Sequence, residues 1–184
     1  MAQEHTEAKK CFAAVANETG QEWSHTLKPI VFYYSRSGRT EKLAHLAAKE
    51  MRAEIMRIEP EYAYGSFSSS ISRVIKERVR REHPRSSTPI PDLSRFDPIF
   101  VGYPVWANDL PEFIGDFLSR CDLEGKTVIP FATFAVSGME KSLASVTAAC
   151  KGAQILYPFE DGMLRGGDYR KWRLNVRRYI WNME

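Results

Sequence analysis

The 184-residue sequence predicts a doubly wound α/β fold, in which helices cover both faces of a parallel sheet. Five short apolar segments, rich in β-branched and aromatic residues, alternate with segments whose apolar residues recur at helical spacing. Continuous apolar strands are typical of a parallel sheet that is buried on both faces. The expected strands span residues 29–34, 53–58, 98–103, 127–132 and 153–158. The expected helices span residues 41–51, 66–85, 111–121, 139–150 and 168–182.

The first strand–turn–helix unit sets the pattern for the others. The strand reads PIVFYY and is followed by the polar turn SRSGRT. In the helix after it, Leu43, Leu46, Ala47 and Met51 fall on one stripe, which we expect to face the sheet. The second unit has a loop rich in Tyr, Gly and Ser before its helix, and Pro84 ends that helix.

The later units follow the same alternation. The third strand leads into a helix that has a proline, Pro111, in its first turn. The fourth strand contains Pro130, which favours an edge position or a bulge because proline cannot donate to the sheet ladder. The fifth strand and an aromatic-rich closing helix complete the chain, so a five-stranded sheet is expected.

The composition is that of one ordinary globular domain. Hydrophobic residues make up 43% of the chain, charged residues make up 27%, and the net charge is +3. We expect residues 1–27, which are polar, to form an N-terminal extension and residues 28–184 to form the domain. No apolar run approaches the roughly 20 residues of a membrane span, and no secretory signal is recognisable, so no membrane partner is expected. The scattered cysteines, Cys11, Cys121 and Cys150, indicate reduced thiols, a cytoplasmic location and no metal site.

Positive charge is concentrated in two stretches of the chain. Residues 73–85 carry six Lys or Arg against two Glu, and residues 165–178 are basic as well. Such runs are typical of a solvated helix face, and an anionic partner or a subunit contact, as in a homodimer, is the alternative. The small net charge does not indicate a nucleic-acid-binding protein. No nucleophile–base pair is recognisable, so we assign no catalytic residue.

The turn after the first strand has the features of an anion-binding site. Ligands of doubly wound sheets lie beyond the carboxyl ends of the strands, and a helix N-terminus there offers unpaired N–H groups to an anion. Three hydroxyls and a glycine gather in this turn, and a Ser/Thr helix cap without a ligand is the alternative. The candidate phosphate-binding residues are Ser35, Arg36, Ser37, Gly38, Arg39 and Thr40.

The same turn resembles the first loop of the flavodoxins, which reads Ser/Thr-x-Thr-Gly-x-Thr and wraps the phosphate of flavin mononucleotide (FMN). Ser35, Ser37, Gly38 and Thr40 match this pattern, whereas Arg39 stands where the family often has asparagine. A cation at this position either pairs with the phosphate or points to solvent. The resemblance implies a flavodoxin-like three-layer sandwich with a parallel sheet of order 2-1-3-4-5, and FMN as cofactor.

The turn after the third strand resembles the second flavodoxin signature, Gly-x-Pro-x-Trp followed by a proline that opens a helix. Trp106 offers an aromatic wall for the isoalloxazine ring, although a tryptophan in the core is the alternative. Backbone groups for the ring are expected from Pro104, Val105, Ala107 and Asn108.

The turn after the fourth strand is similar to the third flavin-contacting loop of the same subgroup. The resemblance implies cofactor contacts at Thr133, Phe134, Ser137 and Gly138. Phe134 belongs to a Phe-Ala-Val stretch that replaces the usual glycine-rich one, so its ring is expected over the flavin edge or partly filling that place.

The family resemblance implies a redox function. Two roles stay open: electron transfer with a redox partner protein, or flavin-dependent reduction of a quinone-type small acceptor, so whether the chain is an oxidoreductase enzyme is left undecided. The predicted pI of 8.7 and Arg39 suggest a cationic surround that raises the flavin potential. The alternative is a flavodoxin-like fold that has lost FMN and acts as a binding or regulatory module.

Overall fold

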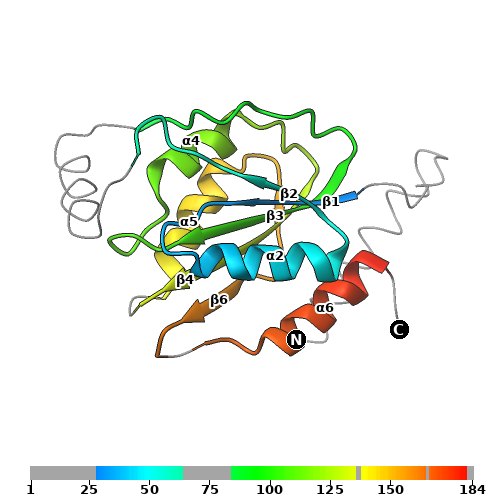
Figure 1. The fold of residues 1–184 in the computed structure, drawn as a ribbon. Coiled ribbons are helices and arrows are strands. Elements are labelled where there is room, and N and C mark those ends of the chain that lie inside the picture. Colours follow the sequence, from blue (N-terminus) through cyan, green and yellow to red (C-terminus); the bar gives the residue numbers. More distant parts are fainter. Residues whose placement is uncertain (1–27, 64–83, 136–137, 165, 182–184) are drawn as a thin grey trace.

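The computed structural model describes residues 28–63, 84–135, 138–164 and 166–181. These residues form a parallel sheet of order β2-β1-β3-β4-β5, with β6 also paired to β4 (Figure 1). The strands are β1 (Lys28–Tyr33), β2 (Glu54–Arg57), β3 (Phe96–Pro104), β4 (Thr127–Phe134), β5 (Gln154–Ile155) and β6 (Phe159–Gly162). The helices are α2 (Arg39–Met51), α4 (Glu112–Arg120), α5 (Glu140–Ala149) and α6 (Tyr169–Trp181). The predicted doubly wound fold and its strand order are confirmed.

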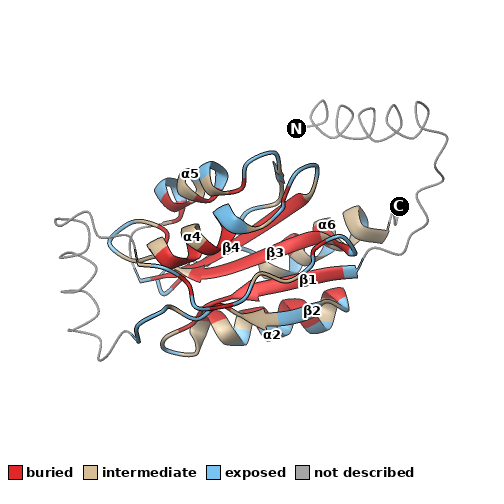
Figure 2. Ribbon diagram, turned by 90° about the horizontal axis from the view of Figure 1, so that it is seen from above, coloured by how far each residue is buried: buried red, intermediate tan, exposed pale blue. Residues whose placement is uncertain are grey.

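Helices cover the two faces of the sheet in pairs (Figure 1). Alternate residues of a strand point to opposite faces, and the cores follow this rule: Ile30 and Phe32 of β1 pack in a cluster with α4 and α5, whereas Val31 and Tyr33 pack with α2 and α6. Strands β1, β3 and β4 are therefore buried on both sides, as Figure 2 shows. This explains why they read as continuous apolar runs in the sequence.

The carboxyl ends of β1, β3 and β4 meet at one rim of the sheet. Parallel pairing places Tyr33 beside Gly102, and Pro104 beside Thr133. The three turns that the sequence analysis selected therefore begin at neighbouring positions of the same edge.

The fifth strand differs from the sequence prediction because it is split in two. β5 pairs with the start of β4 and β6 pairs with its end, and the pairing is interrupted opposite residues 129–130. Pro130, which has no N–H, lies at this interruption. Of the two alternatives for Pro130, an edge position or a bulge, the edge position is not observed, because β4 lies between β3 and the β5–β6 pair; the irregularity falls in the neighbouring strand.

The expected buried stripe of α2 needs correction. The buried stripe of α2 consists of Thr40, Ala44, Ala47, Ala48 and Met51, whereas Leu46 is 41% exposed. The small alanines let α2 lie close to the sheet, and Leu46 falls outside the i, i+3, i+4, i+7 spacing of that stripe.

Parts of the predicted layout fall outside the described residues. These are the extension 1–27 and residues 66–83 of the predicted helix 66–85. The predicted helix does not reach residue 85, because Pro84 and Arg85 lie in no helix and the Arg85 carbonyl accepts a hydrogen bond from the Glu61 N–H. The preceding proline explains this, since it disfavours helical geometry around it. No helix in the described part of the chain is long and apolar enough to span a bilayer.

Candidate functional site

The turn after β1 leads into helix α2 through Gly38. Its φ of 82° is left-handed, a conformation that glycine adopts without steric cost. A Cβ at this position would have only one neighbour within 4 Å, so the backbone angle, rather than lack of space, favours glycine. No side chain caps the N-terminus of α2. The Ser/Thr cap that the sequence analysis kept as an alternative is therefore not formed, and the first N–H groups of α2 face the turn without a side-chain acceptor.

The three hydroxyls of this turn have different surroundings. Ser37 is exposed. Ser35 is 2% exposed, and its Oγ has no hydrogen-bond partner among the described residues. Thr40 is equally buried, and its hydroxyl shares a 2.7 Å hydrogen bond with the hydroxyl of Thr133 on β4. Ser35 is therefore the orphaned buried group of the turn, and Thr40 joins the first turn to the third.

The predicted cations of the turn, Arg36 and Arg39, are both half-buried. Arg39 points neither to solvent nor freely towards an anion. Its Nη2 lies 3.0 Å from Oδ2 of Asp161 on β6, and its Nη1 donates to the carbonyl of Phe134 at 3.4 Å. The sequence analysis missed Asp161. Its position opposite Thr133 depends on the split of the fifth strand, which the sequence did not show.

The turn after β3 is a tight hairpin turn between Trp106 and Asp109. The backbone N–H of each residue donates to the carbonyl of the other at 2.9 Å. Both central residues are left-handed, with φ of 47° at Ala107 and 64° at Asn108, as in a type I′ turn. Asparagine suits this geometry, whereas alanine is strained in it. Both are exposed, and Pro104 and Val105 before them are half-buried.

The sequence left two alternatives for Trp106, an aromatic wall for the flavin ring or a tryptophan in the core. The residue is half-buried, so its surroundings combine features of both. Its ring packs on the α4–α5 core cluster, with centroids 5.6 Å from Tyr34 and 6.4 Å from Phe113. Tyr34 is itself buried at the end of β1. The tryptophan is thus anchored by core aromatics while part of its surface is open at the rim.

Thr133 and Phe134, the last residues of β4 before the third turn, are 4% and 6% exposed. The carbonyl of Thr133 accepts a 2.9 Å hydrogen bond from the Val105 N–H. Gly138 is half-buried and left-handed, with φ of 69°. Ser137 lies outside the described residues. Phe134 is buried, and whether its ring lies over the flavin edge or partly fills that place stays a prediction.

The three turns are joined by direct contacts. Thr40 bonds to Thr133, Val105 bonds to Thr133, and Tyr34 contacts Trp106. The described candidate residues of the three turns therefore lie together at one rim. Their binding of a cofactor stays a prediction.

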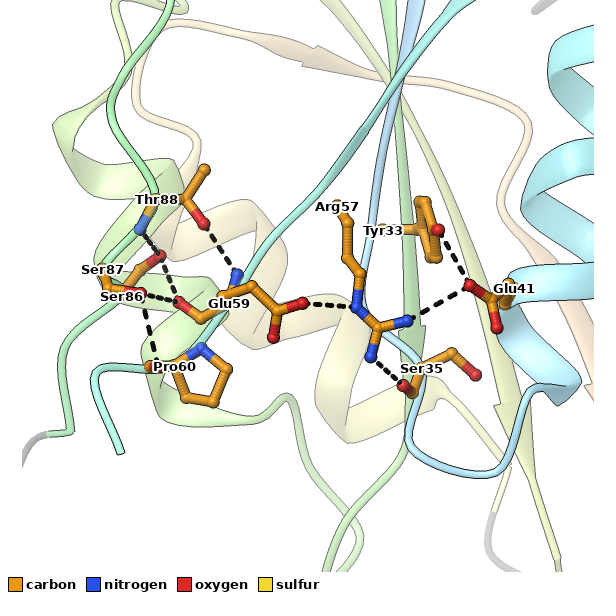
Figure 3. Close-up of polar contacts among 9 residues, drawn as sticks. All are labelled: Tyr33, Ser35, Glu41, Arg57, Glu59, Pro60, Ser86, Ser87 and Thr88. Atoms are coloured by element: carbon orange, nitrogen blue, oxygen red, sulfur yellow. Dashed lines mark hydrogen bonds and ion pairs between the residues drawn. The ribbon is translucent and has the colours of Figure 1, made fainter. Parts of the chain in front are cut away.

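A residue that the sequence analysis missed lies beside the first turn. Arg57, the last residue of β2, donates to the carbonyl of Ser35 at 2.7 Å and pairs with Glu41 and Glu59 (Figure 3). Partial burial lowers the pKa of Arg57, but its hydrogen bond to Glu59 and the nearby carboxylates raise it above the usual value. The expected strand order could have drawn attention to this arginine, because β2 is next to β1 and its carboxyl end reaches the same rim.

No group of three or more His, Cys, Asp or Glu in the described ranges could hold a metal ion. Burial raises the pKa of Tyr34, which keeps this phenol neutral at physiological pH. The rim thus offers backbone donors, neutral hydroxyls and aromatic surface, which suit the binding of a planar anionic cofactor better than acid–base catalysis.

The residues present fit the phosphate group of FMN. A buried hydroxyl without a partner, a left-handed glycine and an uncapped helix N-terminus meet in one turn. Each supplies or permits a hydrogen-bond donor to an anion. A sheet of order 2-1-3-4-5 with this turn after its first strand defines the class of flavodoxin-like α/β proteins.

Comparisons with known proteins agree with this class. The family model described as "Flavodoxin" matches residues 28–175, and the chain therefore belongs to the flavodoxin family. FMN, the cofactor that the sequence predicted, is the one expected for a member of this family. A search of curated proteins found no match.

Solved structures show the same fold. A candidate flavoprotein from Bacteroides uniformis is 25% identical, with a TM-score of 0.69 over 82% of this chain and 97% of that one. A second, from Bacteroides eggerthii, is 24% identical, with a TM-score of 0.66 over 85% and 99%. A flavoprotein from Lactobacillus acidophilus, solved in complex with FMN, is 19% identical, with a TM-score of 0.63 over 72% and 91%.

Proposed function

We propose that this chain binds FMN at the carboxyl rim of its sheet and acts as a redox protein that passes electrons to a partner. The observation that carries the proposal is the geometry of the turn after β1. There the buried Oγ of Ser35 has no partner among the described residues, Gly38 is left-handed, and no side chain of the described residues caps the start of α2. Family membership and the FMN-bound relative from Lactobacillus acidophilus support the choice of cofactor.

In this proposal the first turn holds the phosphate. Ser35 and Ser37 donate their hydroxyls, and the first N–H groups of α2 contribute the partial positive charge of the helix N-terminus. Gly38 lets the backbone follow the phosphate closely. Thr40 acts mainly through its bond to Thr133, which fixes α2 against β4.

The second and third turns border the ring. Trp106 offers the open part of its surface as a wall, and the exposed Ala107–Asn108 peptide offers backbone groups to the ring edge. The bound flavin supplies the redox chemistry, while the protein supplies binding, orientation and electrostatics. A partner protein is the electron acceptor or donor that we propose, in the cytoplasm as the sequence predicts. A quinone-type small acceptor is the alternative outcome of the test.

The first test is FMN binding by the purified chain. The apoprotein is titrated with FMN and with riboflavin, and flavin fluorescence is followed. We expect saturable binding with FMN preferred over riboflavin, because only FMN carries the phosphate. A protein that is colourless as purified and takes up no FMN would refute the proposal and favour the binding-module alternative.

The second test is the variant Ser35→Ala/Ser37→Ala. Loss of two charge-assisted hydrogen bonds should weaken FMN binding by about tenfold to a few hundredfold, and riboflavin binding much less. Ser119→Ala, an exposed serine on α4, is the matched control and should leave both affinities unchanged. Equal FMN affinity in the double variant and the control would place the phosphate elsewhere.

The third test concerns the destination of the electrons. The FMN-loaded protein is photoreduced under anaerobic conditions and mixed either with a one-electron acceptor protein such as cytochrome c or with a small quinone, each at varied concentration. Rapid oxidation by the protein acceptor supports electron transfer. Oxidation by the quinone alone, with saturation kinetics, would replace the proposed role with that of a flavin-dependent reductase.

A further inference from the structure

We propose that Arg57 is a positioning residue that holds the phosphate loop, residues 35–38, in its anion-binding shape. The inference rests on the proposed FMN binding at this loop. Arg57 itself contributes no group to the site: its guanidinium contacts the back of the loop and two carboxylates (Figure 3).

Every guanidinium nitrogen of Arg57 has a different partner. Nη2 donates to the Ser35 carbonyl at 2.7 Å, Nη1 lies 3.2 Å from Oε1 of Glu41, and Nε lies 2.6 Å from Oε1 of Glu59. These partners belong to the phosphate loop, the first turn of α2 and the segment after β2. One planar cation therefore sets the relative positions of three chain segments, which a flexible ammonium could not do.

The bond to the Ser35 carbonyl decides which way the loop faces. A peptide carbonyl carries partial negative charge and would repel a phosphate. Arg57 holds this oxygen on its own side, and in Figure 3 the Ser35 hydroxyl points away from that side. The partnerless Oγ is thereby left for another acceptor.

Arg57 also balances charge beside the loop. Glu41 begins α2 next to the turn, and its Oε2 lies 4.0 Å from the place that a Cβ on Gly38 would occupy. Together Arg57, Glu41 and Glu59 carry one net negative charge, and without the arginine they would carry two. An unneutralised Glu41 would oppose an anion bound at the helix N-terminus.

Glu59, one of the two carboxylate partners of Arg57, is held in place by residues 86–88, which precede β3. The N–H of Glu59 donates to Thr88 Oγ1 at 2.7 Å, and its carbonyl accepts from Ser86 Oγ at 3.0 Å and from the Ser87 N–H at 2.9 Å. Ser86 is in turn held by Asp116 of α4. Glu59 is therefore fixed on both its backbone groups, and it offers Arg57 a firm anchor.

The ion pairs of Arg57 are not a large source of folding stability. The side chains of Arg57, Glu41 and Glu59 are 36%, 37% and 52% exposed, and pairs of such exposure contribute little to stability. The guanidinium also lies near the rings of Tyr33 and Tyr34, at 5.8 and 5.6 Å. The effect of Arg57 should therefore appear in ligand selectivity more than in the stability of the apoprotein.

The experiment compares Arg57→Met with Arg95→Met in the full chain. Arg95 also carries an exposed cation that pairs with a glutamate, but it lies beside the first residue of β3, far from the rim. FMN and riboflavin affinities are measured by flavin fluorescence, and apoprotein Tm by circular dichroism. Arg57→Lys keeps the charge without the planar fork and serves as the second variant if the methionine variant does not fold.

We expect Arg57→Met to weaken FMN binding about 10- to 100-fold, because part of the binding free energy must then go into ordering the loop that Arg57 no longer holds. Riboflavin affinity should stay within about twofold, apoprotein Tm should fall no further than in Arg95→Met, and Arg57→Lys should lose FMN affinity to an intermediate extent.

Unchanged FMN affinity in the Arg57 variants would overturn the inference, as would equal losses for FMN and riboflavin, which indicate a general structural role. Absence of FMN binding by the wild-type chain is a different result, because it refutes the proposed function before Arg57 is tested.

Discussion

The hydrogen bond between Thr40 and Thr133 can be tested by a double-mutant cycle of valine substitutions. Both side chains are almost fully buried, at 2% and 4% exposure, and their hydroxyls are 2.7 Å apart. Replacing one threonine leaves the other hydroxyl buried without its partner, which costs about 1–3 kcal/mol of unfolding free energy. Replacing both removes the bond and the unsatisfied group together. The double variant should therefore be about 1–2 kcal/mol more stable than the sum of the single losses predicts.

Urea denaturation of the four apoproteins, followed by circular dichroism, measures this coupling. Thr147→Val is the control, since Thr147 is exposed on α5 and its hydroxyl bonds only to its own helix. We expect the control to change stability by at most about 0.5 kcal/mol. Single losses that add up to within about 0.5 kcal/mol of the double variant would refute the direct bond between the two hydroxyls.

Three further outcomes are expected from the rim and the core. Asp161→Asn removes a carboxylate beside the first turn, so FMN binding should tighten by about two- to tenfold, with a steeper salt dependence, in fluorescence titrations at several ionic strengths. Gly102→Ala should lower the unfolding free energy by about 1–3 kcal/mol in urea, because its Cβ would overlap the ring of Phe131; a neutral effect would contradict this close packing. Burial raises the pKa of the Cys121 and Cys150 thiols to about 12. An unfolded thiol ionises at about pH 8.5, so the contribution of the two buried thiols to stability is complete below that pH and is lost as the pH rises towards about 12. Labelling of the native protein with a thiol reagent at about pH 8, read by mass spectrometry, should be slow at both cysteines and fast in urea.

The sequence predicted the alternation of strands and helices and the position of the rim because both depend on local patterns, whereas the strand order was implied by the family resemblance. A strand such as PIVFYY is apolar at every position, and the turn after it carries hydroxyls and a glycine whatever the rest of the chain does. The prediction failed where a neighbouring element decides the outcome. Leu46 is apolar but falls off the buried stripe of α2, and the split of the fifth strand opposite Pro130 depends on pairing between distant segments.

The polar partners of the site were harder to predict than its position. Thr40 and Thr133 were both expected to contact the cofactor, but they bond to each other across 93 residues of sequence. Arg39 was expected to meet phosphate or solvent, and the structure adds a partner that was not expected, Asp161. A single sequence shows which donors and acceptors are present, whereas their pairing follows from the packing of α2 on β4 and from the register of β4 with β6.

The paired arginines bear on how the loop can attract an anion. Arg39 has Asp161 as its partner, and Arg57 has Glu41 and Glu59, so neither brings an unbalanced positive charge to the turn. Attraction by the loop then depends on Arg36, on its neutral donors and on the helix N-terminus, the last two of which act over short distances. The cationic surround that the sequence suggested is reduced at Arg39, and with it the argument for a raised flavin potential. FMN affinity should therefore depend less on salt in the wild-type chain than in Asp161→Asn, because only the variant gains a net positive charge at the rim.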